Sequence, residues 1–225
     1  RHDRLRPYRK LGFGVAVADQ IEGPYRVLNP DAPLFKGNHA TLVTTPAGRT
    51  YVYYDLDGRM YVAKLNLEEG RLMEKPVEML GPATLGEAFH FLDAPSVYEK
   101  NGRYHLLYTQ FYGGYVIKAY HLISDQPTGP WRFLQAEPLL SFTEAEASQE
   151  LQMPYASPNG FAPPTQVVFS HQIFRGHDGQ YYLAYHSSEK YAEPYLMIEP
   201  FHWEGEQIKL FAPKKPRQTH PQTQD

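Results

Sequence analysis

Ten residues in the second half of the chain give the clearest indication of the fold: Asp125-Gln126-Pro127-Thr128-Gly129-Pro130-Trp131-Arg132-Phe133-Leu134. It repeats an earlier stretch, Asp19-Gln20-Ile21-Glu22-Gly23-Pro24-Tyr25-Arg26-Val27-Leu28. In both copies an apolar run precedes the aspartate, and Gly-Pro followed by an aromatic residue closes a turn. Self-similarity of this kind is typical of folds that use one supersecondary unit several times. The aspartates of the two copies are therefore interpreted as structural.

Tyrosine-rich runs form a second repeat. Short runs of β-branched and aromatic residues follow glycine turns and predict strands at 50–54, 60–63, 104–108 and 181–185. Three of the turns include Gly48, Gly102 and Gly179, and the residue pairs Asn-Gly and Asp-Gly among them are strong hairpin signals. Counting back eight residues from each of these glycines gives Ala40, Ala94 and His171. The three turns are therefore expected to open equivalent hairpins.

Three such sheets, each about four strands long, predict the blades of an all-β propeller. The innermost strand of a blade runs along the central channel, so the residues at its start converge on the channel mouth. The eight-residue count places His39, Asp93 and Ser170 there. Helical periodicity is weak, and the one helical patch is expected at 143–151, inside a long loop at about 136–165.

Composition excludes several classes of protein. The 225 residues include no cysteine, which rules out disulfide frameworks and cysteine-based zinc sites. A net charge of −3 gives no basic field for nucleic acid, and no apolar run is long enough for a membrane helix. The first residues lack the apolar core of a signal peptide.

Four stretches, in order, resemble glycoside hydrolase family 43, whose members are five-bladed propellers that cleave arabinosyl and xylosyl linkages. They are Gly14–Asp19 with Gly23-Pro24-Tyr25, His39–Gly48, Asp93-Ala94-Pro95 with Tyr98–Tyr104, and His171–His186 with Leu196–Trp203. The resemblance implies a propeller over 1–212, with the end of blade two at 11–28, blade three at 36–70, blade four at 90–134 and blade five at 166–212. Residues 213–225 are expected to form a disordered tail. The chain would then cover roughly three and a half blades and lack blade one and most of blade two.

The same resemblance implies an inverting reaction with two carboxyl groups, one donating a proton and one activating water. The family's acid is a glutamate at the start of blade four, where this chain has Asp93. A third carboxylate stands at the start of blade three in the family, and His39 occupies that position here. The family's base lies in blade one, so no residue of this chain is assigned to it. Asp93 and His39 are the catalytic candidates.

Four further residues are candidates for substrate binding: Asn38, His90, His171 and Tyr112. Asn38 could contact a sugar hydroxyl, Tyr112 could stack on a sugar ring, and His171 could hold a water or an ion on the axis. His171 could instead be a half-buried strand residue, His90 a loop residue, and most tyrosines are explained by packing between blades. The catalytic candidate Asp93 also has a structural interpretation, as a cap at the start of a strand.

We therefore expect a hydrolase of O-glycosyl bonds in arabinose- or xylose-containing polysaccharides. The alternative is a non-catalytic carbohydrate-binding propeller, which the changes to Asp93 and His39 favour; a scaffold protein without a sugar site is the third reading. No cofactor is required and no metal-ligand cluster is recognised, although the resemblance allows a Ca²⁺ or Na⁺ ion on the propeller axis. A second chain or an N-terminal segment could complete the ring, or the propeller could be open. The resemblance favours an extracellular or periplasmic location.

Overall fold

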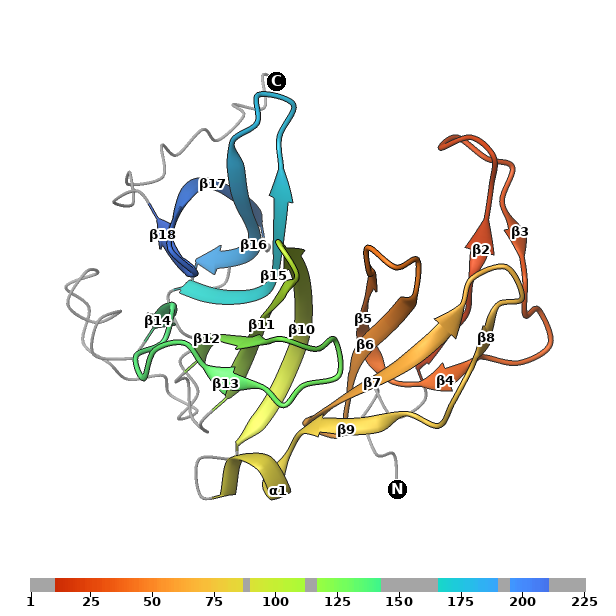
Figure 1. Ribbon diagram of the computed structural model, residues 1–225, viewed down its shortest axis with the longest axis horizontal. Coiled ribbons are helices and arrows are strands. Elements are labelled where there is room, and N and C mark those ends of the chain that lie inside the picture. Colours follow the sequence, from red (N-terminus) through yellow and green to blue (C-terminus); the bar gives the residue numbers. More distant parts are fainter. Residues whose placement is uncertain (1–10, 87–89, 112–116, 143–165, 190–194, 211–225) are drawn as a thin grey trace, which may run out of the picture.

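The computed structural model describes residues 11–86, 90–111, 117–142, 166–189 and 195–210. Three antiparallel sheets dominate this part of the chain (Figure 1). No helix in these ranges has the length and hydropathy needed to cross a membrane. The expected helical patch at 143–151, most of the loop around it and the tail from 213 lie outside the described residues.

The first large sheet follows the chain in order and corresponds to blade three. Its strands are β5 (Asn38–Thr44), β6 (Thr50–Leu56), β7 (Arg59–Asn66) and β8 (Arg71–Leu72), with β9 (Val77–Leu80) also paired to β7. A single helical turn, α1 (Pro82–Leu85), follows β9 and leads toward the next sheet. The sequence did not predict this short helix.

The second and third large sheets repeat the same meander. Blade four contains β10 (Phe91–Lys100), β11 (Arg103–Phe111), β12 (Ile117–Ser124) and β13 (Arg132–Phe133), with β14 (Leu140–Phe142) paired to β12. Blade five contains β15 (Gln166–Arg175), β16 (Tyr181–Glu189), β17 (Tyr195–Glu204) and β18 (Gln207–Leu210). The strands and hairpins expected at the tyrosine-rich runs are therefore confirmed.

Two short strand pairs precede blade three. They are β1 (Gly12–Phe13) with β4 (Phe35–Lys36), and β2 (Ala16–Val17) with β3 (Arg26–Val27). The repeated ten-residue stretch gives the same turn twice, because Gly23 N–H donates to the Gln20 carbonyl and Gly129 N–H to the Gln126 carbonyl. In each copy the aromatic turn leads into a short strand, β3 or β13.

The core lies between neighbouring sheets. Leu106 on β11 packs into the cluster shared with blade three, whereas the next residue, Leu107, packs into the cluster shared with blade five. Successive side chains of a strand point to opposite faces, so a sheet covered on both sides buries consecutive apolar residues. Tyr53 adds a buried hydrogen bond between blades, since its hydroxyl donates to the Pro127 carbonyl at 2.8 Å. This packing fixes the starts of β5 and β10 relative to each other.

Candidate active site

Each of the three innermost strands contains the same irregularity near its start. The pairing register shifts between Asn38 and Thr41 in β5, between Asp93 and Ser96 in β10, and between Phe169 and Gln172 in β15. One residue in each bulge has a positive φ: His39 at 45°, Ala94 at 53° and Ser170 at 58°. Bulges redirect a strand and re-aim its side chains, and they are common beside active sites.

This irregularity corrects the register counted from the sequence. The bulges make Ala94, not Asp93, the structural equivalent of His39 and Ser170. The count is wrong by one residue in blade four because β10 ends at Lys100 and β11 begins at Arg103, which leaves two residues in the turn. The corresponding turns span five residues, 45–49 and 176–180. Asp93 therefore aligns with Asn38, immediately before the bulge.

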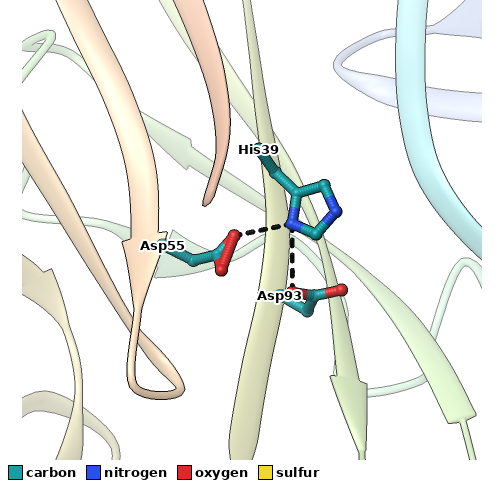
Figure 2. Close-up of side chains that lie close together, drawn as sticks. All are labelled: His39, Asp55 and Asp93. Atoms are coloured by element: carbon teal, nitrogen blue, oxygen red, sulfur yellow. Dashed lines mark hydrogen bonds and ion pairs between the residues drawn. The ribbon is translucent and has the colours of Figure 1, made fainter. Parts of the chain in front are cut away.

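Despite that shift, the structure brings His39 and Asp93 together. Nδ1 of His39 lies 3.1 Å from Oδ1 of Asp93 and 2.8 Å from Oδ2 of Asp55 (Figure 2). The three side chains come from three strands, β10 for Asp93, β5 for His39 and β6 for Asp55. One N–H group thus faces two carboxylates, that of Asp55 in its own sheet and that of Asp93 across the seam in blade four.

The cluster is graded from buried to exposed. The side chain of Asp55 is 5% exposed, that of Asp93 15% and that of His39 32%. Asp55 is also held from behind, because the Ala94 N–H in the bulge of β10 donates to its Oδ2 at 3.4 Å. The imidazole and Asp93 are therefore the parts of the cluster that a ligand can reach.

The two carboxylates control the charge of the imidazole. Burial alone would lower the pKa of His39, but its hydrogen bonds to Asp55 and Asp93 and the charges of both carboxylates raise that pKa to about 10. Burial raises the pKa of Asp55, and the hydrogen bond from His39 opposes this increase. At neutral pH, His39 is therefore a fixed cation bonded to two acidic groups.

Asp55 is the site residue that the sequence analysis missed. It is the last residue but one of β6, in which Tyr51, Tyr53 and Asp55 alternate onto one face, and all three are buried. An acidic residue on the buried face of an aromatic strand needs a partner, because burying an unpaired charge is costly. That alternation was the available signal, but no local motif names the partner.

The other candidates fall in different places. The side-chain amide of Asn38 lies 3.4 Å from Nε2 of His39, so Asn38 borders the same ring. His90 lies directly before the first residue of β10, the strand that carries Asp93. Tyr112 lies outside the described residues.

His171 belongs to a separate, buried position on β15. It is 2% exposed and packs against Tyr185, with ring centroids 6.0 Å apart. Burial lowers its pKa to about 4, so the ring is neutral at neutral pH. Neither ring nitrogen has a hydrogen-bond partner within the part of the chain that the structure describes.

Donor atoms of His39, Asp55 and Asp93 lie within 4.8 Å of one another, close enough to share one divalent cation. Nitrogen and oxygen ligands of this kind suit several such cations. The proton on Nδ1 already bridges both carboxylates, so a cation binding there would have to displace it.

Comparison with known proteins gives the family. A model of the glycosyl hydrolases family 43 matches residues 6–208. No curated protein matches the chain significantly. Among solved structures, the chain is similar to a thermostable family-43 glycoside hydrolase, with a TM-score of 0.66, 18% identity, and coverage of 94% of this chain and 70% of that one.

Two further solved structures have comparable similarity. For an endo-1,4-β-xylanase from Bacteroides thetaiotaomicron, the TM-score is 0.64 at 20% identity, covering 88% of this chain and 66% of that one. For an α-L-arabinofuranosidase from Clostridium thermocellum, the TM-score is 0.59 at 19% identity, covering 88% and 64%. The chain spans as little as 35% of the length of other structures that it matches. The three large sheets and the part-strands before them correspond to roughly three and a half blades of a five-bladed propeller. Because the family model matches most of its length, the chain belongs to glycoside hydrolase family 43.

Proposed function

We propose that this chain acts in the hydrolysis of O-glycosyl bonds in arabinose- or xylose-containing polysaccharides. Family membership supports the reaction class. The observation that carries the proposal is the carboxyl group of Asp93, which lies accessible at the start of blade four and bonded to His39. Arabinose and xylose are proposed because an arabinofuranosidase and a xylanase are among the structures with this fold.

In this proposal Asp93, whose Oδ1 is bonded to His39, carries a proton on Oδ2 and donates it to the leaving oxygen, while a second carboxylate activates water on the opposite face of the sugar. Inverting enzymes keep these two carboxyl groups about 6.5–9.5 Å apart to leave room for that water. Asp55 is bonded to the same imidazole nitrogen as Asp93, so it is too close to be the second group. We propose that the base comes from a segment or a second chain beyond the described residues.

His39 then has an orienting role. A group whose pKa is about 10 keeps its proton at neutral pH, so it is a poor shuttle for that proton. Its two hydrogen bonds instead fix the carboxyl group of Asp93 against the buried Asp55. Precise positioning matters because an error of about 1 Å in a reacting group can cost roughly a hundredfold in rate.

One observation favours a second candidate, a carbohydrate-binding propeller without turnover. His39 donates to Asp93 as to an ionised acceptor, whereas an acid catalyst must carry its own proton. A binding site gains from this arrangement, because a fixed cation and the carboxylate of Asp93 offer both donors and acceptors to sugar hydroxyls.

Activity and binding assays on the full chain separate the two candidates. The substrates are 4-nitrophenyl α-L-arabinofuranoside and 4-nitrophenyl β-D-xylopyranoside, with the anomer of the first-formed sugar followed by proton NMR. Release of the inverted anomer supports the hydrolase. Binding of arabino- or xylo-oligosaccharides without release supports the binding propeller, and neither binding nor release contradicts both.

We further propose that a small polar occupant, a water or a hydrated Ca²⁺ or Na⁺ ion, contacts His171. The support is that both ring nitrogens of His171 are buried without partners among the described residues. Hard cations prefer oxygen ligands, which favours water as the direct contact of the imidazole. Thermal unfolding in Ca²⁺, in Na⁺ and in a chelator tests the ion, since a bound ion raises the unfolding temperature.

We propose that the propeller ring is completed by a further segment or by a second chain. We also propose that the protein is located outside the cell membrane, where it would encounter polysaccharides. The mass of the isolated chain in solution tests the first proposal. Fractionation of the source cells tests the second, because a purely internal protein would contradict it.

A further inference from the structure

Phe91 is an exposed aromatic residue beside the Asp93 cluster that no catalytic role explains. It is the first residue of β10 and is 52% exposed. We propose that Phe91, supported by Phe111, is an aromatic platform that stacks on the ring of a sugar unit next to the bond facing Asp93. This inference rests on the proposed carbohydrate function and adds a subsite to it.

The ring of Phe91 is held on two sides. Phe111 is its cross-strand partner on β11, and the two rings meet edge to face with centroids 6.1 Å apart at 76°. On the other side the ring covers Gly58 in the turn between β6 and β7, where a Cβ would lie 2.6 Å from Cδ2 of Phe91. The backbone locks the same place, because Leu92 N–H donates to the Gly58 carbonyl at 3.1 Å. The platform is therefore preorganised, which lowers the entropy lost on binding.

The platform and the polar cluster lie along one seam. Phe91 and Asp93 are two residues apart on a strand, so their side chains leave the same face, with Cα atoms about 7 Å apart. Both turn toward blade three, Phe91 to Gly58 and Asp93 to His39. This separation is roughly the width of one sugar ring, so a unit stacked on Phe91 would direct its hydroxyls toward Asp93 and His39.

The pairing of surfaces fits a carbohydrate. A sugar ring has apolar faces of C–H groups and a rim of hydroxyls, and binding sites combine aromatic surface with a few placed polar groups. Phe91 supplies apolar surface, while His39 and Asp93, the parts of the cluster that a ligand can reach, supply charged donors and acceptors. Each sugar unit added to a ligand should therefore gain affinity until the platform is covered.

Blade four offers a matched control in Phe133. It is 41% exposed and meets Tyr120 edge to face, with centroids 5.7 Å apart at 77°. Phe133 lies on the outer strand β13, away from the innermost strand that carries Asp93. Its exposure and packing resemble those of Phe91, but it lies on a different strand from the cluster of His39, Asp55 and Asp93.

Calorimetric titration of the full chain with xylotetraose and arabinotetraose tests the platform. We expect Phe91→Ala to weaken binding of the tighter-binding tetrasaccharide by about tenfold. This loss corresponds to the free energy of burying about half of a phenylalanine side chain. Phe91→Trp keeps an aromatic surface and should bind within about threefold of the parent, and Phe133→Ala should match the parent. Circular dichroism spectra verify that each variant is folded.

Equal affinity of Phe91→Ala and the parent would overturn the platform and leave the proposed function intact. A loss of affinity in Phe133→Ala as large as that in Phe91→Ala would have the same meaning. If Phe91→Ala does not fold, Phe91→Lys and Phe91→Trp decide, and equal affinity in those two overturns the platform. A parent that binds neither tetrasaccharide and hydrolyses neither aryl glycoside contradicts the proposed function and the platform together.

Discussion

At the scale of single residues, the charge on His39 depends on two carboxylates. Its pKa of about 10 reflects hydrogen bonds to Asp55 and Asp93 that more than offset the effect of burial. Removing either acid removes one hydrogen bond and one negative charge, so the imidazole should lose its proton at a lower pH. The cluster would then lose the cation that holds Asp93 in place.

We predict that Asp55→Asn lowers the titration midpoint of His39 by about one pH unit or more. The midpoint is measured by NMR from the ring-proton shifts of His39, assigned with a His39→Gln variant. Asp93→Asn is the matched change on the other side and should also lower the midpoint. A midpoint near 10 in Asp55→Asn would show that Asp55 does not sustain the charge.

Residue types were easier to predict from sequence than their partners. Asp93 and His39 stand out because they begin strands within a repeated pattern, and the structure joins them. Asp55 was missed because its partner is 16 residues away and pairing across strands depends on the bulge of β5. Local sequence does not encode that approach.

At the scale of elements, blades four and five meet at a buried histidine pair. Nδ1 of His105 on β11 lies 2.9 Å from Nε2 of His121 on β12, and Trp203 of β17 packs against His105 with centroids 4.7 Å apart. Burial lowers the pKa of His105 to about 4 and that of His121 to about 3. Both rings are therefore neutral in the folded protein at neutral pH.

This pair predicts acid sensitivity. Each folded-state pKa lies below the ordinary value of 6.5, so the unfolded chain binds more protons from about pH 6.5 down to about 4 for His105 and about 3 for His121. The contribution of the neutral pair to the free energy of unfolding should be fully present above pH 6.5 and be lost as the pH decreases through that range. We predict that His121→Gln, which keeps a neutral polar side chain, reduces the slope by up to about 1.4 kcal/mol per pH unit. Denaturant unfolding at pH 7, 6, 5 and 4 measures it, and an unchanged slope would contradict the assignment.

Strands and hairpins were predictable because glycine turns and alternating aromatic residues are local signals. Asn101 and Gly102 both have positive φ in the turn of blade four, as Asn-Gly hairpins require. The register was not predictable to the residue, since a two-residue turn and a five-residue turn both contain a glycine. Counting from Gly102 therefore displaced Asp93 by one position.

At the scale of the whole molecule, the last sheet has an apolar face turned away from the core. Leu196 is 60% exposed and Ile198 51% exposed on β17, while Met197 between them packs against the cluster shared with blade four. In a propeller, both faces of a blade are covered by neighbours. Exposed apolar surface on a sheet favours association.

We predict that the double change Leu196→Lys and Ile198→Lys lowers self-association of the isolated chain. Light scattering over a concentration series should show a smaller rise in apparent mass than for the parent, with an unchanged circular dichroism spectrum. Phe133→Lys, on an outer strand, is the control and should behave as the parent does. The same rise in all three proteins would mean that this face is not the contact.

The proposed role of Asp93 as proton donor is tested by comparing Asp93→Asn with the parent on two aryl glycosides. A poor leaving group needs the acid, whereas 2,4-dinitrophenolate leaves without it. We predict that kcat/KM of Asp93→Asn falls by at least about a hundredfold for the phenyl glycoside and by less than about tenfold for the dinitrophenyl glycoside. Equal rates for parent and variant on the phenyl glycoside would show that Asp93 is not the proton donor.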